Sequence, residues 1–411
     1  MRSWLVAVGT VVIGIFILQA GNGLFGSFFA LRMTIEHFPT AVIGLVVTGY
    51  PLGFLLGCLF LPRLVRSVGH IRAFAAMASL LCCTTLVFAV HIEPLFWGLL
   101  RTVTGFAAAG LFMVGESWLA EKATNAARGK VFALYTISNM TAVSASQLML
   151  GLADPSGYVF YMITAGLFAA CLIPVALTRA SEPALPSVEP LGLVGLYRLS
   201  PVAVVGCIGA GLMNTAVGSI GPVYASAIGF DPAGVGSFMA VLLFGGMLLQ
   251  WPIGRLSDRW DRRYVLLMTT LGMALLALAV ALLGRQSRPA LFGLLLFYGG
   301  LAYTVYPLCV NHANDHAGRN HVVSVSAGLL LSWAAGSIGG PTLATLAMAY
   351  AGPSGLFFYV AGVALLFSLF TLWRIGRRAA LPADLREAFV AKSPTTPAAA
   401  ELNPRAGPAA P

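Results

Sequence analysis

The stretch GRLSDRWDRR, residues 254–263, carries six charged side chains in ten positions. Only 9% of the 411 residues are charged and 58% are hydrophobic, and the mean hydropathy is +0.87. A soluble chain would need about a quarter charged residues to cover its cores. The composition instead predicts an all-α membrane protein, in which this charged stretch is a loop between two spans.

Long apolar runs occur on both sides of the charged stretch, along almost the whole chain. A helix needs about 20 apolar residues to cross the hydrocarbon layer. The first run is too long for a signal-peptide core and is predicted to be retained as a span. Twelve transmembrane helices are predicted, at residues 4–31, 41–62, 73–90, 94–120, 131–152, 158–178, 200–225, 233–254, 264–284, 290–312, 322–350 and 353–373.

The basic residues lie almost entirely on one set of loops. Of the 24 Lys and Arg residues, the opposite loops hold only Arg32, Arg285 and Arg288. The positive-inside rule then predicts that both termini are cytoplasmic, and we expect a bacterial inner membrane. The net charge of +10 therefore orients the protein in its membrane, and no nucleic acid is predicted as a partner.

The two halves of the chain repeat at an offset of 192 residues. This offset takes NGLFGS (22–27) to NTAVGS (214–219), Gly53 to Gly245, and PRLVRSVGHI (62–71) to the charged stretch. Such a parallel repeat predicts two six-helix bundles. We expect bundles at residues 1–178 and 200–378, a cytoplasmic linker at 179–199 and a disordered cytoplasmic tail at 379–411 rich in Ala and Pro.

The charged stretch also resembles the loop signature of the major facilitator superfamily. The residues that carry this resemblance are Gly254, Asp258, Arg259, Arg262 and Arg263, although Asp261 replaces the usual glycine. RTVTG (101–105) resembles the Arg-containing motif of the same superfamily. GESWLAEKATNAARGKVFALY (115–135) and YPLCVNHANDHAGRN (306–320) resemble a YcaD-like branch. The resemblance implies the major facilitator fold, with twelve helices in two bundles.

The resemblance further implies a cytoplasmic latch that closes in the outward-open state. It would comprise Asp258, Arg259, Arg262 and Arg263, with Glu121 and Arg128 of the first half as candidate partners. Exposed ion pairs of modest strength suit a contact that must break in each cycle. The alternative is that these charges only hold the loop in the cytoplasm. In the first-half copy Arg66 replaces the expected Asp, so a second latch is not predicted.

Two ionisable residues lie inside predicted spans. Arg101 could bind an anionic group of a substrate or join a proton relay, and the alternative is a strut bonded to carbonyl groups. Glu116 could titrate during proton-coupled transport, because burial raises the pKa of a carboxyl group towards the working pH. Its alternative is a structural ion pair with loop arginines.

Amide side chains at equivalent positions of the two repeats are candidates for substrate binding. Asn22 and Asn214 fall in spans 1 and 7, which the resemblance places around a central cavity. Asn139 and Tyr303 could join them, as could Gln19, Gln147 and Gln250. Hydrogen bonding between helices is the ordinary alternative for all of them.

No metal or cofactor is predicted. The six cysteines are spread over apolar runs without zinc or disulfide spacing. His312 and His316 are four residues apart, but they lie at the end of a span, where a polar cap or a partner of the latch is favoured over a metal.

The sequence thus predicts a secondary active transporter of a small organic solute, with a weak preference for an anion and with proton coupling. We expect it to be a monomer whose partners are the solute, protons and membrane lipid, and not an enzyme, because no nucleophile and base have workable spacing. Proton-linked efflux of amphipathic compounds is the alternative within transport. A non-transporting receptor or assembly factor is the alternative from another class.

Overall fold

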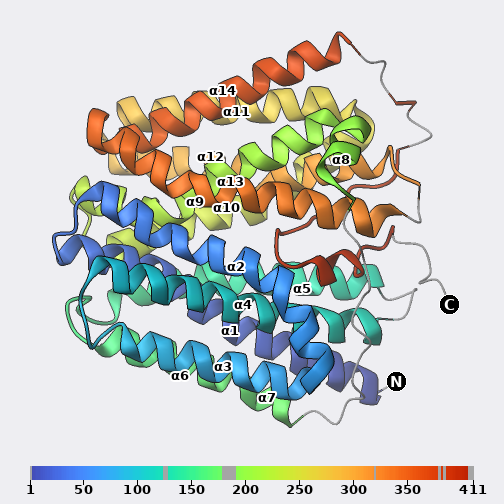
Figure 1. Cartoon of the computed structure of the whole chain (residues 1–411). Coiled ribbons are helices and arrows are strands. Elements are labelled where there is room, and N and C mark those ends of the chain that lie inside the picture. The colour runs from blue at the N-terminus through green and yellow to red at the C-terminus, as the bar shows by residue number, and fades with distance from the viewer. Residues whose placement is uncertain are drawn as a thin grey trace.

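The computed structural model describes residues 2–123, 128–177, 191–318, 321–377, 381–382 and 386–405. Over these ranges the regular structure is helical and contains no strand. The helices form two bundles that lie side by side (Figure 1).

The first bundle contains the helices of the N-terminal half. They are α1 (Arg2–Ile35), α2 (Thr40–Val68), α3 (His70–Val87), α4 (Pro94–Lys122), α5 (Arg128–Gln147), the 3-10 turn η1 (Leu148–Gly151), α6 (Val159–Ala170) and α7 (Leu172–Ala176).

The second bundle contains the helices of the C-terminal half, and a short helix, α8 (Leu193–Leu199), lies before it in the predicted linker. The bundle helices are α9 (Pro201–Ala227), α10 (Pro232–Arg259), α11 (Arg262–Leu283), α12 (Arg288–Asn314), α13 (Val322–Ala351) and α14 (Gly355–Ile375). A further 3-10 turn, η4 (Pro397–Ala400), lies in the C-terminal tail.

The predicted fold class is confirmed. Within the described ranges, eleven helical segments are long and apolar enough to cross a membrane. The remaining predicted span is α5, which is helical but carries Ser, Thr, Asn and Gln side chains along its length. The sixth span is divided at Cys171 into α6 and α7.

Several helices begin at a polar residue followed by proline. Asp231 accepts a hydrogen bond from Gly234 N (3.0 Å) at the start of α10, and Glu93 accepts one from Leu95 N (3.0 Å) at the start of α4. These caps satisfy backbone groups that a helix start leaves without partners, and proline at the first helical turn loses no hydrogen bond.

Glycines at equivalent positions bring helices into close contact in both bundles. A Cβ atom on Gly53 of α2 would lie 1.8 Å from the carbonyl oxygen of Thr102 in α4. A Cβ atom on Gly245 of α10 would lie 2.0 Å from the carbonyl oxygen of Leu296 in α12. The two bundles therefore repeat the same helix packing, as the sequence repeat predicts.

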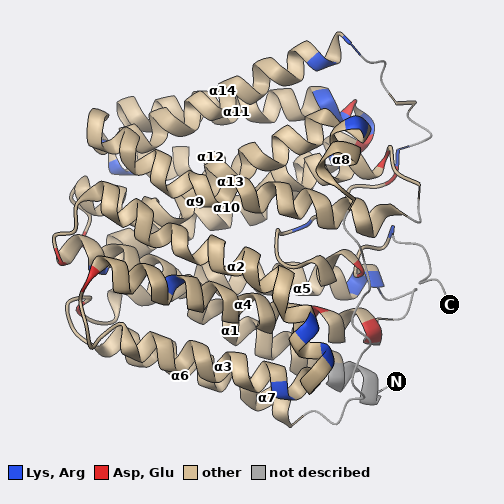
Figure 2. Ribbon diagram, viewed as in Figure 1, with Lys and Arg blue, Asp and Glu red and all other residues tan. Residues whose placement is uncertain are grey.

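The molecule has two ends, which we name by their helix termini. The terminus face is the end where α1 begins at Arg2 and α14 ends at Ile375, and the opposite face is the end where α1 ends at Ile35 and α2 begins at Thr40. Figure 1 shows the start of α1 and the described part of the C-terminal tail at the first of these ends. Lys and Arg residues lie mostly towards this terminus face (Figure 2).

The two bundles meet near the opposite face. Thr48 of α2 lies with its Oγ1 atom 3.0 Å from Oγ1 of Thr342 in α13, and it donates to the carbonyl oxygen of Ile338 (3.2 Å). A Cβ atom on Gly236 of α10 would lie 2.3 Å from the carbonyl oxygen of Gln147. The opposite face is thus closed by direct helix contacts between the bundles.

The described part of the C-terminal tail lies between the bundles at the terminus face (Figure 1). The turn η4 contacts α4 of the first bundle and α13 of the second. The sequence predicts disorder for this tail, and that remains a prediction. In the structure, buried polar groups of the helices contact residues 386–405, which composition alone does not reveal.

Candidate functional site

A cavity of about 210 Å³ lies between the two bundles. Its walls come from α1 and α5 of the first bundle and from α9, α10 and α12 of the second. The lining residues are Gln19, Asn22, Gly23, Gly26, Ser27, Val143, Gln147, Gly218, Met239, Leu243 and Tyr303. None of these lining residues is charged, so the cavity offers hydrogen bonds and apolar surface.

Two polar atoms on this lining have no hydrogen-bond partner within the described chain. They are the amide nitrogen Nδ2 of Asn22 and the amide oxygen Oε1 of Gln147, and both atoms are buried. Gln147 is held in place because its Nε2 donates to the carbonyl oxygen of Gly23 (3.0 Å). Buried polar groups usually have partners, so a donor and an acceptor without partners on one cavity are suited to a polar ligand.

The structure brings only some of the predicted amide set to the cavity. Asn22 and Tyr303 line it, whereas Asn214 and Asn139 are not among the lining residues. Asn139 is buried on α5, one helical turn from Tyr135. Asn214 is half-buried on α9, and its Oδ1 atom has no partner within the described residues.

Arg101 lies inside the first bundle and not on the cavity lining. Its guanidinium carbon is 4.8 Å from the ring centre of Tyr50, 5.1 Å from that of Phe29 and 5.4 Å from that of Phe25. Its Nε atom has no hydrogen-bond partner in the described part of the chain. Three aromatic faces therefore surround this buried cation, and such faces attract a positive charge.

Glu116 is fully buried near the terminus face of α4. Its Oε1 atom accepts a short hydrogen bond from the hydroxyl group of Tyr135. Its Oε2 atom accepts from the backbone nitrogen of Thr396 (3.3 Å) and, at short range, from the hydroxyl group of the same residue. Because Thr396 belongs to the tail, a side chain predicted for proton coupling is bonded to a segment predicted to be disordered.

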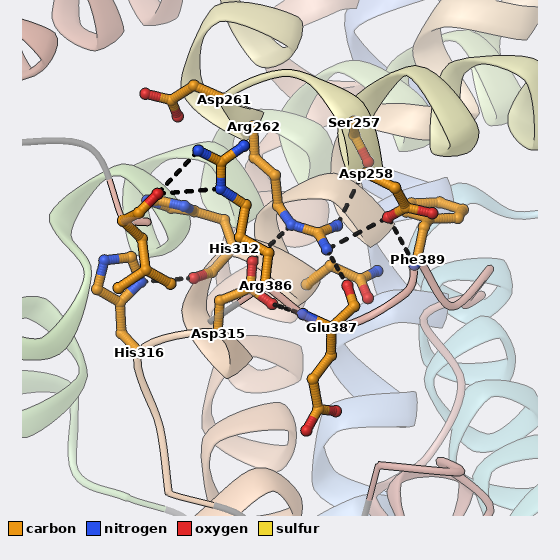
Figure 3. A network of polar contacts seen from close by, with 12 residues as sticks. Ser257, Asp258, Asp261, Arg262, His312, Asp315, His316, Arg386, Glu387 and Phe389 are labelled. Carbon is orange, nitrogen blue, oxygen red and sulfur yellow. Dashed lines mark hydrogen bonds and ion pairs between the residues drawn. The ribbon is translucent and has the colours of Figure 1, made fainter. Parts of the chain in front are cut away.

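Two of the predicted latch residues, Asp258 and Arg262, contact each other. Asp258 lies 3.4 Å from Arg262 and accepts a hydrogen bond from Phe389 N of the tail (2.8 Å). Arg262 also pairs with Asp315, with Nε 2.5 Å from Oδ2. Figure 3 shows Arg262 between Asp258 and Asp315, with the tail beside it.

Asp261, which replaces the usual glycine, caps the start of α11. It accepts a hydrogen bond from Arg263 N (3.0 Å) and forms an ion pair with the Arg263 side chain (2.7 Å). These contacts of Arg263 and those of Arg262 lie within the second bundle and the tail.

The other predicted latch residues lie elsewhere on the terminus side. Arg259 is exposed at the end of α10, and Glu121 is exposed at the end of α4. Arg128 is half-buried at the start of α5.

The histidines form an edge-to-face pair at the terminus end of α12. The ring centres of His312 and His316 are 4.8 Å apart, and His316 Nδ1 lies 2.8 Å from the carbonyl oxygen of His312. Among the residues that the structure describes, no group of three or more His, Cys, Asp or Glu side chains could hold a metal ion. The pair lines a narrow pocket of about 20 Å³ beside Asp261, Arg263 and Arg386.

Sequence reasoning missed the tail residues that complete these contacts. Thr396, Arg405 and the main chain of residues 387–390 bond to helix residues of the two bundles. Asp315 pairs with both Arg262 and Arg405, and the sequence does not indicate this role. No local pattern in the tail signals these contacts, because they depend on buried groups far away in the sequence.

The sequence matches the family model described as Major Facilitator Superfamily over residues 11–327 and 203–406. An "Uncharacterized MFS-type transporter" of Yersinia pestis (strain Pestoides F) is 27% identical over 364 residues, which cover 87% of this chain and 93% of the relative. The "Uncharacterized MFS-type transporter YcaD" of Salmonella enteritidis PT4 (strain P125109) is 26% identical over 381 residues, covering 92% and 98%.

Solved structures show the same fold at low sequence identity. The nucleoside transporter NupG superposes with a TM-score of 0.75 at 13% identity, covering 89% of this chain and 98% of that chain. A bacterial homologue of the human lysosomal transporter Spinster, in an inward-facing and occupied conformation, superposes with a TM-score of 0.72 at 13% identity, covering 94% and 98%.

Proposed function

Because the chain belongs to the major facilitator superfamily, we propose that it is a secondary active transporter that moves a small polar organic solute by alternating access. The observation that carries this proposal is the cavity between the bundles, where Asn22 Nδ2 and Gln147 Oε1 have no partner in the described chain. A solute that accepts from one amide and donates to the other would satisfy both. Rocking of the bundles about this point would expose it to each side in turn.

The preference for an anionic solute is a finer part of the proposal and rests on Arg101. No described carboxylate pairs with this buried cation, and aromatic rings surround it. An anionic group that reached it would gain an ion pair in a medium of low dielectric constant. The cavity lining itself is uncharged, so binding of an anion requires Arg101 to reach the solute from the neighbouring layer of side chains.

Proton coupling is proposed to depend on Glu116. This carboxyl group is buried and bonded to two hydroxyl groups, those of Tyr135 and Thr396. A buried carboxyl group that gains and loses such partners changes its proton affinity. Coupling would therefore follow if the partners of Glu116 differ between the two conformations of the transporter.

We further propose that the terminus face is cytoplasmic in a bacterial inner membrane. The gathering of Lys and Arg at that face supports this orientation (Figure 2). A monomer is expected, because the cavity is formed by the two bundles of one chain.

A thermal-shift screen of the purified protein tests the binding proposal. The screen covers neutral polar metabolites, carboxylates, vitamins and drugs, and it is repeated with Asn22→Ala, Asn214→Ala and Arg101→Ala. Loss of one hydrogen bond to a neutral solute weakens binding by about 1 kcal/mol, which is roughly fivefold in Kd. We expect this loss with Asn22→Ala and a smaller one with Asn214→Ala, since only Asn22 lines the cavity.

The outcomes separate the parts of the proposal. Stabilisation by an anion that disappears in Arg101→Ala supports the anionic preference, and stabilisation that survives this change removes it. Stabilisation only by amphipathic drugs would favour proton-linked efflux, and an accumulation assay in cells with and without the protein then gives the direction. For an identified solute, uptake driven by a pH gradient in proteoliposomes that survives Glu116→Gln would contradict proton coupling through Glu116.

A further inference from the structure

The C-terminal tail binds the second bundle through its main chain. Asn311 of α12 donates to the carbonyl oxygen of Val390 (2.8 Å) and accepts from Val390 N (3.1 Å). Asp258 of α10 accepts from Phe389 N (2.8 Å). These two helix residues therefore bind adjacent peptide groups of the tail by specific hydrogen bonds.

A buried charge cluster fixes the end of the same segment. Asp315 accepts from Arg262 Nε (2.5 Å) through one oxygen and from Arg405 Nη1 (3.1 Å) through the other. The side chains of all three residues are at most 5% exposed. Arg405 also donates to the carbonyl oxygen of Ala388 (3.1 Å). If the tail followed another path, Asp315 would lose Arg405 and a buried charge would be left unpaired. The cluster therefore favours this path of the tail.

The middle of the tail reaches the first bundle. Thr396 donates to Glu116 through its backbone nitrogen and its hydroxyl group. The next residues form η4, in which Ala398, Ala399 and Ala400 are buried. Leu402 is fully buried in the apolar core of the first bundle. One segment thus bonds to α4 on one side and to α10 and α12 on the other.

We infer that residues 386–405 are an intramolecular plug that occupies the opening between the bundles and holds the protein in the present conformation. The inference builds on the proposed alternating access. The opposite face can open only if the bundles approach each other at the terminus face, and the tail fills the space through which they would move. Transport would then require the plug to leave, which also removes Thr396 from Glu116. The opening is in this sense a peptide-binding site whose ligand is the chain's own tail.

Two cysteine positions test the plug without a known substrate. In a background without native cysteines, Leu402→Cys reports whether the tail is docked, and Lys130→Cys, at an exposed position, is the control. Thr345→Cys reports on the opposite face, because Thr345 is fully buried on α13 beside Gly44 of α2. The probe is a maleimide applied to the purified protein, and the rate of labelling is measured.

We expect Leu402→Cys to react at least tenfold more slowly than Lys130→Cys. Deletion of residues 386–411 should raise the labelling rate of Thr345→Cys severalfold, because the opposite face opens more often. The double substitution Thr396→Val with Arg405→Ala should also raise the labelling rate of Thr345→Cys in the full-length chain. This variant replaces the deletion in the test if the deleted chain does not fold.

Two results would overturn the inference. Labelling of Leu402→Cys at the control rate would show that the tail does not dock. Slow labelling of Leu402→Cys together with an unchanged rate at Thr345→Cys, in both the deleted and the substituted chain, would show that the tail docks without holding the conformation. Neither result depends on the solute, so a failure of the transport proposal would appear separately in the thermal-shift screen.

Discussion

Arg101 illustrates how one charge can be tolerated in an apolar bundle. Its guanidinium carbon faces the rings of Tyr50, Phe29 and Phe25 at 4.8 to 5.4 Å. A desolvated cation over aromatic rings gains on the order of 2 kcal/mol, whereas burial of the charge costs more than that. The rings therefore offset part of the cost and leave an unpaired cation inside the protein, which is unfavourable for stability.

The substitution Arg101→Met separates a functional role from a structural one. Met keeps the length of the side chain and removes the buried charge, so we expect a melting temperature no more than a few degrees below that of the unchanged protein. Binding of an anionic solute should be lost, as measured by thermal shift. A large fall in melting temperature with binding retained would show that Arg101 is a strut.

Lys392 gives the docked tail a dependence on pH. Its side chain is 5% exposed, and burial lowers its pKa to about 7 from an ordinary value of 10.5, with Arg405 adding to the decrease and Glu116 opposing it. A free tail would keep the ordinary pKa, so docking releases a proton between these two values. Docking is therefore weakest at pH 7 and below, and it strengthens as the pH rises above 7.

Labelling of Leu402→Cys across this pH range measures the effect. Relative to Lys130→Cys, the rate should fall between pH 7 and pH 9, by up to about tenfold per pH unit. Lys392→Met, which cannot bind a proton, should label slowly at every pH. If the Met variant kept the full pH dependence, another group would be responsible.

The candidate site residues and the tail residues that contact them differ in how clearly the sequence indicates them. Arg101 and Glu116 are conspicuous because a charge inside an apolar run needs a reason. Thr396 and Arg405 are not, because they lie among Ala, Pro and Ser residues that indicate disorder. Their partners Glu116 and Asp315 are 280 and 90 residues away, and no spacing rule connects such positions.

At the scale of helices, close packing depends on glycine at particular positions. A Cβ atom on Gly53 would lie 1.8 Å from Thr102 O, 2.7 Å from Thr102 C and 2.9 Å from Thr102 Cα. All three are backbone atoms of α4, so a rotamer change cannot relieve the contact. An alanine at this position must push α2 and α4 apart.

Gly53→Ala should consequently destabilise the protein by about 1–3 kcal/mol, the usual cost of overpacking. Gly362→Ala on α14 is the matched control, because a Cβ atom there meets nothing within 4 Å. Alanine should stabilise that helix by about 0.5–1 kcal/mol. Thermal unfolding of both variants in detergent measures the difference, and equal melting temperatures would contradict the tight packing of α2 on α4.

The length of an apolar run predicts where a helix lies better than it predicts whether that helix is continuous. The predicted spans match the observed helices because about 20 apolar residues have few stable alternatives in a membrane. The break at Cys171 between α6 and α7 is not among the predictions. Its cause is present in the sequence, because Pro174 cannot donate a hydrogen bond to the carbonyl oxygen of Ala170. Gln147 of α5, a candidate from the sequence, lines the central cavity.

At the scale of the whole molecule, the repeat determines the architecture but not the conformation. Both open and closed arrangements of two equivalent bundles satisfy the same sequence repeat. The present arrangement depends on contacts between halves, such as Thr48 with Thr342 and Gly236 with Gln147. These pairs are far apart in the sequence. The repeat relates the helices involved, because Gly236 is equivalent to Gly44, on which a Cβ atom would lie 3.0 Å from the carbonyl oxygen of Pro341 in α13. The repeat does not determine whether these helices are in contact at this face.

Closure of the opposite face can be made permanent with a disulfide. The Oγ1 atoms of Thr48 and Thr342 are 3.0 Å apart, so sulfur atoms at these positions need to move by only about 1 Å to reach bonding distance. In a background without native cysteines, Thr48→Cys with Thr342→Cys should crosslink on mild oxidation. The single variants cannot form this bond and are the controls.

The crosslinked protein should remain folded and keep Leu402→Cys protected from maleimide, because the tail docks in the conformation that the disulfide traps. Transport of an identified solute should stop on oxidation and return on reduction, while the single variants stay active. Transport that continued through the crosslinked protein would mean that the bundles need not separate at α2 and α13. Alternating access by rocking of the two bundles would then be the wrong mechanism, even though the fold would stand.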